Sequence, residues 1–197
     1  MILVEETQVA DAALPVDALK QHLRLGTGFA EDDVQDAVLK SFLRAALAAI
    51  EARCSKALMS RAFVMTVDEW REGDAQPLPV APVEAITDVT LVDAYGATTT
   101  ADPARYRLVK DSFAPVLKAK GSSLPGISPE GAAEVRFVAG YGPAFGDVPA
   151  DLQQAVLLLA AHYYEYRDET ALGQGCMPFG VTSLIARYRP MRLGMGV

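Results

Sequence analysis

The segment 134–167, EVRFVAGYGPAFGDVPADLQQAVLLLAAHYYEYR, contains a change of hydrophobic period that decides the fold. Its first part, Glu134–Ala139, alternates and is rich in β-branched and aromatic residues, which predicts a strand. Its second part begins at Pro149 and keeps apolar residues at helical spacing as far as about Arg167, which predicts a helix. Strand and helix follow each other directly, so the chain belongs to a class that combines both.

Two further helices are predicted in the N-terminal part of the chain. The first covers Pro15–Leu25 and ends before Gly26, a residue type that suits the C-terminus of a helix. The second covers about Glu31–Arg53 and opens with carboxylates at the positive end of the helix dipole. The apolar arcs of this helix and of the helix after Pro149 are wider than one small core needs. We therefore expect each of them to pack against more than one neighbour.

Between the second and third helices the hydrophobic period changes to two. Strands are predicted at Glu134–Ala139 and at four earlier segments separated by turn residues: Ala62–Trp70, Ile86–Val92, Tyr106–Val109 and Val116–Ala119. The sequence therefore predicts an α+β fold, a helical bundle of about three helices with a small antiparallel β-domain inserted between the second and the third. The expected parts are an N-terminal helical part (1–57), an inserted β-rich domain (58–146), a C-terminal helix packing on the N-terminal helices (147–169) and an extended docking tail (170–197).

The segment after Glu169 differs from the rest of the chain in charge and composition. It contains three arginines and no acidic residue, whereas the whole chain has a net charge of −7. Its glycines and weak periodicity predict an extended tail with one short ordered piece at Val181–Tyr188. Such a tail is suited to becoming ordered on a partner. We expect that deleting Thr170–Val197 leaves a folded body.

Composition indicates a soluble protein of the cytoplasm. The two cysteines, Cys54 and Cys176, do not make a disulfide framework, and the N-terminus lacks the basic and then apolar order of a secretory signal. The longest apolar run, Ala155–Ala161, is far shorter than the roughly 20 residues of a membrane span. The negative net charge argues against wrapping duplex nucleic acid, because phosphates need a basic face.

Three groups of residues are candidates for chemistry, and each has a simpler structural interpretation. His162 and Glu165 can share a helix face, but a metal site of that type needs ligands from other helices. Cys176 lies in a Gly-rich segment without a neighbouring base in the sequence. The acidic cluster at 31–36 lacks the pattern of a calcium loop and fits compensation of the helix dipole. The sequence therefore predicts no catalytic residue, no metal site and no cofactor, and the chain is not expected to be an enzyme.

Several segments, taken in chain order, resemble one protein family. They are Val16–Arg24, Asp32-Asp33 at the head of the long helix, Pro79–Val83, Val89–Gly96, Val135–Gly142, Val148–Leu152, Ala155–Arg167 and Pro178–Arg189. Together they make residues 14–190 similar to the head–tail connector (adaptor) proteins of long-tailed bacteriophages, prophages and phage-like gene transfer agents. The long acidic lead Glu5–Ala13 and Cys54, where glycine is commoner, depart from the family pattern.

The resemblance implies a structural subunit of a ring, typically of twelve copies, that lies beneath the portal, joins head to tail and lines the DNA channel. The implied partners are other copies of the chain, the portal protein and a stopper or tail-completion protein, with DNA only in passage and no membrane. Assembly is expected in the cytoplasm, with a final place in the neck of the particle.

A ring subunit must present two different adhesive faces. The wide apolar arcs predict a subunit interface at Val38, Phe42, Leu43, Leu47, Leu157, Leu158, Tyr163 and Tyr164. The tail is predicted to dock on the portal or another partner through Phe179, Leu184, Ile185, Arg187, Tyr188, Arg189 and Arg192.

Two other functions are weighed against the connector. A different neck or tail-completion component, such as a stopper, shares a β-rich middle but more often lacks two long helices on either side of it. A small enzyme or ligand-binding protein would use His162, Glu165 and Cys176, and metal analysis of the purified protein would reveal it.

Overall fold

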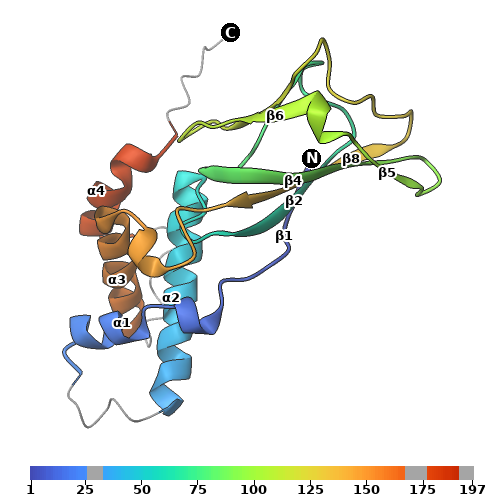
Figure 1. Ribbon diagram of the computed structural model, residues 1–197. Helices are drawn as coiled ribbons and strands as arrows, with labels where there is room; N and C mark the ends of the chain where they lie inside the picture. Colours follow the sequence, from blue (N-terminus) through green and yellow to red (C-terminus); the bar gives the residue numbers. More distant parts are fainter. Residues whose placement is uncertain (26–32, 167–176, 191–197) are drawn as a thin grey trace. The chain divides into compact units, whose positions relative to one another are not determined.

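The computed structural model describes residues 1–25, 33–166 and 177–190 and shows an α+β fold with an antiparallel sheet (Figure 1). The chain divides into two compact units, each built from two separate segments of the sequence. The sheet unit comprises Met1–Val9 and Ser55–Pro143, and the helical unit comprises Ala10–Cys54 and Ala144–Val197. The first nine residues, which the sequence assigned to the helical part, thus belong to the sheet unit.

The described residues of the sheet unit form two antiparallel sheets. A five-stranded sheet has the order β1-β2-β8-β4-β5, and a three-stranded sheet has the order β3-β7-β6. The strands are β1 (Ile2–Glu5), β2 (Arg61–Val67), β3 (Ala75–Pro77), β4 (Val83–Val92), β5 (Thr98–Thr100), β6 (Tyr106–Val109), β7 (Val116–Ala119) and β8 (Ala132–Ala139). The sequence predicts β2, β4, β6, β7 and β8 but not the three short strands β1, β3 and β5.

One hydrophobic core is shared by both sheets. Alternate residues of β8 are fully buried, and among them Phe137 stacks on Phe63 of β2 with ring centroids 5.7 Å apart. Leu117 of β7 and Tyr106 of β6 belong to the same cluster, which joins the small sheet to the large one. A fully buried side chain of this size contributes roughly 1.5–3 kcal/mol. The period of two in the sequence therefore matches the face of each strand that the core covers.

The helical unit is built around two long helices. It contains α1 (Val16–His22), α2 (Asp33–Cys54), α3 (Ala150–Glu165) and α4 (Phe179–Ile185), with short 3-10 turns η1 (Asp11–Ala13), η4 (Phe145–Asp147) and η5 (Ala186–Tyr188). Helix α2 packs along α3, and α1 contacts both of them. Part of the wide apolar arc of α2 is therefore used inside the subunit. Within the described residues, no helix combines the length and the apolar character that a membrane crossing requires.

The described part of the C-terminal segment, residues 177–190, is not an extended tail. Helix α4 packs on α3 (Figure 1). The side chains of Val181, Ile185 and Tyr188 are buried. The short ordered piece that the sequence predicts is thus a helix followed by a 3-10 turn that completes the core of the helical unit. Deleting residues 170–197 would remove these three core side chains. The expectation that such a truncated chain stays folded is therefore not supported.

Candidate assembly surfaces

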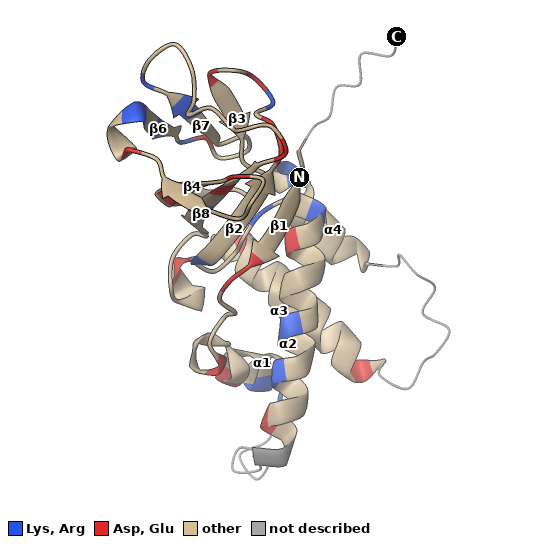
Figure 2. Ribbon diagram, turned by 90° about the vertical axis from the view of Figure 1, so that its right-hand side faces the viewer, with Lys and Arg blue, Asp and Glu red and all other residues tan. Residues whose placement is uncertain are grey.

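The acidic residues at the N-terminal end are held by basic partners within each unit. In the sheet unit, Arg61 lies 2.8 Å from Glu5, and Arg136 lies 3.1 Å from Glu6. Figure 2 shows how acidic and basic residues are distributed over the ribbon. The acidic lead, which departs from the family pattern, therefore anchors β1 to the sheet.

A second acidic contact fixes the start of the helical unit. The carboxylate of Asp11 lies 2.6 Å from Arg44 and 3.5 Å from Lys40, both on α2. The hydrogen bond from the Arg44 guanidinium holds the pKa of Asp11 below its usual value. Lys20 of α1 makes a comparable pair with Asp36 of α2 at 2.5 Å. Asp36 in the first turn of α2 therefore helps to anchor the preceding helix α1.

The predicted subunit-interface residues fall into two groups. Leu43 and Leu47 are buried within the helical unit, so in this structure they have no surface left for a neighbouring subunit. Val38 is 42% exposed, while Phe42, Leu157, Leu158, Tyr163 and Tyr164 are half-buried. The second group keeps apolar surface that another molecule can cover, and its role in an interface stays a prediction.

Phe42 of α2 lies near a group of aromatic rings at the C-terminal end of α3. Phe42 and Tyr164 meet edge to face with ring centroids 6.2 Å apart, and His162 lies 4.7 Å from the ring of Tyr166. We call Val38, Phe42, Tyr163, Tyr164 and Tyr166 the aromatic helix surface. Partly exposed aromatic residues are common at protein interfaces because they offer a large contact area with few rotatable bonds.

The predicted docking residues of the tail are also divided by the structure. Phe179 is 88% exposed and Arg189 is exposed, whereas Ile185 and Tyr188 are buried against the subunit's own helices. Leu184 is half-buried. Arg192 lies outside the described residues. Among the predicted docking residues that the structure describes, Phe179, Arg187 and Arg189 are therefore exposed to a partner.

A polar contact that the sequence did not reveal holds the tail to α3. The hydroxyl of Tyr188 donates a hydrogen bond to Asp151 at 2.7 Å, and the guanidinium of Arg187 lies 2.7 Å from the other carboxylate oxygen. Burial raises the pKa of Tyr188, and the bond to Asp151 raises it further. Arg187 is thus engaged within its own subunit, although its side chain remains largely exposed.

The candidate residues for chemistry are not assembled into a site in the described part of the chain. No group of three or more histidine, cysteine, aspartate or glutamate side chains there could hold a metal ion. His162 packs on Tyr166, and Cys54 is buried. Cys176, Glu31 and Asp32 lie outside the described residues.

Several exposed apolar residues escaped the sequence analysis. Tyr95, at the tip of the β4–β5 hairpin, is 96% exposed, and Met1 and Ile2 are exposed at the edge of the sheet. The signal for Tyr95 was an aromatic residue within a predicted turn, Ala94-Tyr95-Gly96. Turn residues are normally polar, so an aromatic side chain there is a sign of a contact surface.

A comparison with solved structures matches the chain to parts of gene transfer agent particles. The chain matches, over 100% of its length and 99% of theirs, chains in structures of the neck of an empty gene transfer agent (GTA) particle computed with C6 symmetry and of the virion of a native GTA particle. The identities are 50% and 49%, with TM-scores of 0.90 and 0.87. A chain of the neck of a native GTA particle computed with C12 symmetry matches with 45% identity and a TM-score of 0.85, over the same shares of the two chains.

Two other comparisons gave no match. No family model matches the sequence, and no curated protein sequence matches it significantly. The solved structures that do match are parts of particles rather than enzymes.

Proposed function

This chain belongs to the family of these gene transfer agent particle chains and is a structural component of a particle neck, and we propose that it is the head–tail connector (adaptor) subunit. The observation that carries the proposal is similarity over the whole chain, at 45–50% identity, to chains of the neck. The match covers 100% of this chain and 99% of the neck chains.

The neck structures support a ring made of copies of one chain, because they were computed with sixfold and twelvefold rotational symmetry. We take twelve subunits as the number. Each copy in such a ring uses one face to bind its left neighbour and a different face to bind its right neighbour. The aromatic helix surface, together with Leu157 and Leu158, is our candidate for one of these faces.

The partners proposed are the portal above and a stopper or tail-completion protein below. Phe179 and Arg189 are exposed residues of the described tail, and aromatic residues and arginines are common interface anchors. A chain with a net charge of −7 repels rather than holds a passing duplex, which suits the lining of a DNA channel.

The connector and the alternative, a stopper, differ in what they bind first. Native mass spectrometry of the purified chain, alone and after mixing with the cognate portal, separates them. A connector forms a portal complex with multiple copies of the chain in the absence of other neck proteins. If no complex forms with the portal alone but one forms on a portal that already carries another neck ring, the chain is the stopper.

The tail contact can be tested with two variants and a matched control. Phe179→Ala and Arg189→Glu are each expected to weaken portal binding by on the order of tenfold, as truncation of an interface anchor does. Ser183→Ala alters an exposed residue of the same helix and should bind like the unaltered chain. Equal binding by all three variants would exclude this segment from the portal contact.

A further inference from the structure

The β4–β5 hairpin of the sheet unit holds an aromatic side chain at a rigid tip. Asp93 accepts, through Oδ1, hydrogen bonds from the backbone N–H groups of Tyr95 at 2.9 Å and Ala97 at 2.8 Å. The backbone of Gly96 has a φ of +83°, which a glycine adopts without strain. The tip is therefore fixed before any partner binds, and little conformational entropy is lost when it does.

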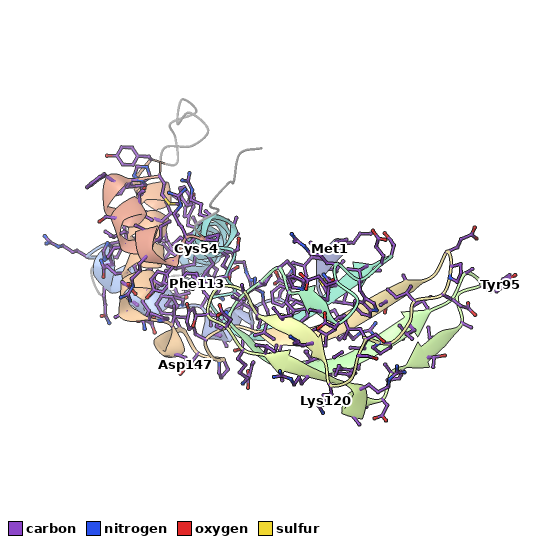
Figure 3. All side chains as sticks on the ribbon, turned by 90° about the horizontal axis from the view of Figure 1, so that it is seen from above. Met1, Cys54, Tyr95, Phe113, Lys120 and Asp147 are labelled. Atoms are coloured by element: carbon purple, nitrogen blue, oxygen red, sulfur yellow. The ribbon has the colours of Figure 1, made fainter. Side chains whose placement is uncertain are left out.

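The side chain of Tyr95 is not buried in its own subunit, so it adds no hydrophobic stabilisation there. It is 96% exposed, the highest fraction among the large apolar residues of the described chain. An exposed tyrosine on a fixed loop is the usual form of an interface anchor, since an aromatic side chain can bury roughly 150–250 Å². Figure 3 shows Tyr95 at the end of the sheet unit, well away from Met1.

A pocket that suits such a side chain lies elsewhere on the same unit. It has a volume of about 490 Å³ and is open to solvent, and none of its walls comes from the hairpin tip. Its apolar lining includes Met1, Pro77, Leu78 and Pro79, and its polar lining includes Asp68 and Glu69. Proline rings pack well on an aromatic ring, and a carboxylate can accept a hydrogen bond from a tyrosine hydroxyl.

Tyr95 and the pocket lie at opposite edges of the five-stranded sheet. Tyr95 follows β4 and precedes the edge strand β5, whereas Met1 precedes the other edge strand, β1. A protrusion that fits a hollow at a different place on the same molecule links copies head to tail, and such a contact closes into a ring when the rotation allows. Contact between two identical edges would instead stop at a pair.

We propose that Tyr95 of one subunit inserts into the Met1–Pro79 pocket of the next subunit in the ring. The inference rests on the proposed function for the existence of the ring, and it adds a contact between sheet units to that of the helices. The occupant of the pocket is thus a second copy of this chain. The hydroxyl of the inserted Tyr95 lies against Asp68 or Glu69, and its ring lies against Pro77 and Pro79.

Site-specific cross-linking in assembled particles tests the contact without removing the anchor. Ala94→Cys and Glu69→Cys both replace exposed residues, one beside Tyr95 and one in the lining of the pocket. They are introduced together in a Cys176→Ser background, in which the remaining Cys54 is buried. Treatment of purified particles with a short bismaleimide is expected to give a ladder of covalent multimers of this chain.

Each single-cysteine variant should give monomers only, because every expected link joins position 94 of one subunit to position 69 of the next. Adding Tyr95→Ala to the double variant should reduce the ladder by on the order of tenfold. The exposed Thr99→Ala of the same hairpin should leave the ladder intact. Tyr95→Phe should reduce it less than Tyr95→Ala, because it keeps the ring and loses only the hydroxyl. Failure of the ladder in necks that contain the chain overturns this inference and leaves the connector assignment standing.

A cross-link from the Ala94→Cys single variant, either to itself or to another neck protein, likewise overturns the inference. Absence of the unaltered chain from purified necks is a different result. It overturns the connector assignment itself, and the ring contact with it.

Discussion

Gly140 ends strand β8 in a conformation that no other residue type adopts easily. Its φ is +144°, and its N–H donates to the carbonyl of Pro82 at 2.9 Å. A Cβ atom there would lie 2.3 Å from the backbone nitrogen of Ser60 and 2.5 Å from the carbonyl carbon of Met59. Both atoms are backbone and cannot rotate away, so the sheet unit needs glycine at this position.

Gly140→Ala is therefore expected to lower the free energy of unfolding of the sheet unit by roughly 3 kcal/mol, from backbone strain and overlap together. Trp70 is the single tryptophan of the chain, and its indole is bound to the carbonyl of Pro125 inside this unit. Its fluorescence during urea unfolding reports the change. Gly121→Ala, at a glycine with open space around it, should unfold like the unaltered chain. Equal midpoints for both variants would contradict the prediction.

The stability of the helical unit is expected to depend on pH through Asp11. Because its pKa is lower in the folded chain than its ordinary value of 3.8, its pairing stabilises the fold above that value. The stabilisation is lost as the pH falls through the lower, folded pKa. Asp11→Asn should thus be less stable than the unaltered chain at pH 7, and the difference should close on acidification.

The measurement for Asp11 is thermal unfolding followed by the helical circular dichroism signal, from pH 7 down to pH 2. A second series in an Arg44→Gln background is the control, since Arg44 is the main cause of the shift. In that background Asp11→Asn should change little. A difference in stability between the unaltered chain and the Asp11→Asn variant that stays constant with pH would show that the ion pair does not stabilise the fold.

At the scale of elements, α4 has one face for its own subunit and another for a partner. Ile185 is fully buried, whereas Phe179 is 88% exposed on the same helix. Ile185→Ala is expected to cost about 2–4 kcal/mol of helical-unit stability, as large-to-small changes in a core do. Phe179→Ala should leave the helical melting curve unchanged. A loss of stability in the Phe179 variant would mean that this side chain belongs to the core.

The long elements were predictable from sequence because their periodicity extends over several turns or residue pairs. The short ones were not. Strand β1 is apolar at three successive residues and exposed throughout, so no alternation marks it, and β5 consists of three threonines. Strand β3 ends on Pro77, which weakens a strand prediction. Their existence follows from pairing with distant strands, and a single sequence carries no record of that pairing.

The predicted interface and tail residues show the same limit of sequence-based prediction, because their burial depends on contacts with distant residues. Spacing alone put Val38, Phe42, Leu43 and Leu47 on broad apolar stripes, but it could not tell which of them α3 covers. The contact between Tyr188 and Asp151 joins residues 37 positions apart. It helps to hold residues 179–188 against the helical unit, although the sequence predicted a free tail there. The spacing of Val181, Ile185 and Tyr188 did carry a helical signal, which Gly180 and Pro178 obscured.

The whole molecule is interlaced, since the chain enters the sheet unit, leaves it for the helical unit, and does this twice. Neither unit is one continuous segment, and each has its own buried core. Removing β1 or residues 179–188 therefore takes a piece out of one unit. Point variants at exposed residues are consequently the proper means of testing the assembly contacts.

The net charge of the whole molecule predicts that the protein binds duplex DNA weakly. The chain carries 25 acidic and 18 basic residues, and several of the arginines are already paired, Arg61, Arg136 and Arg187 among them. Neutralising a row of phosphates needs a cluster of unpaired cations on one face. The purified protein should therefore bind duplex DNA more weakly than about 10⁻⁴ M, the weak limit of ordinary non-specific binding, at physiological salt.

An electrophoretic mobility shift assay at about 150 mM and about 50 mM salt checks this, with a basic DNA-binding protein as the positive control. Even at the lower salt concentration no retarded duplex is expected, because lowering salt strengthens binding only where phosphate contacts exist. A retarded complex whose affinity falls steeply with salt would instead reveal a basic face. A channel lining that repels the duplex lets it slide, whereas a basic face would hold it, so that result would oppose the proposed channel role as well.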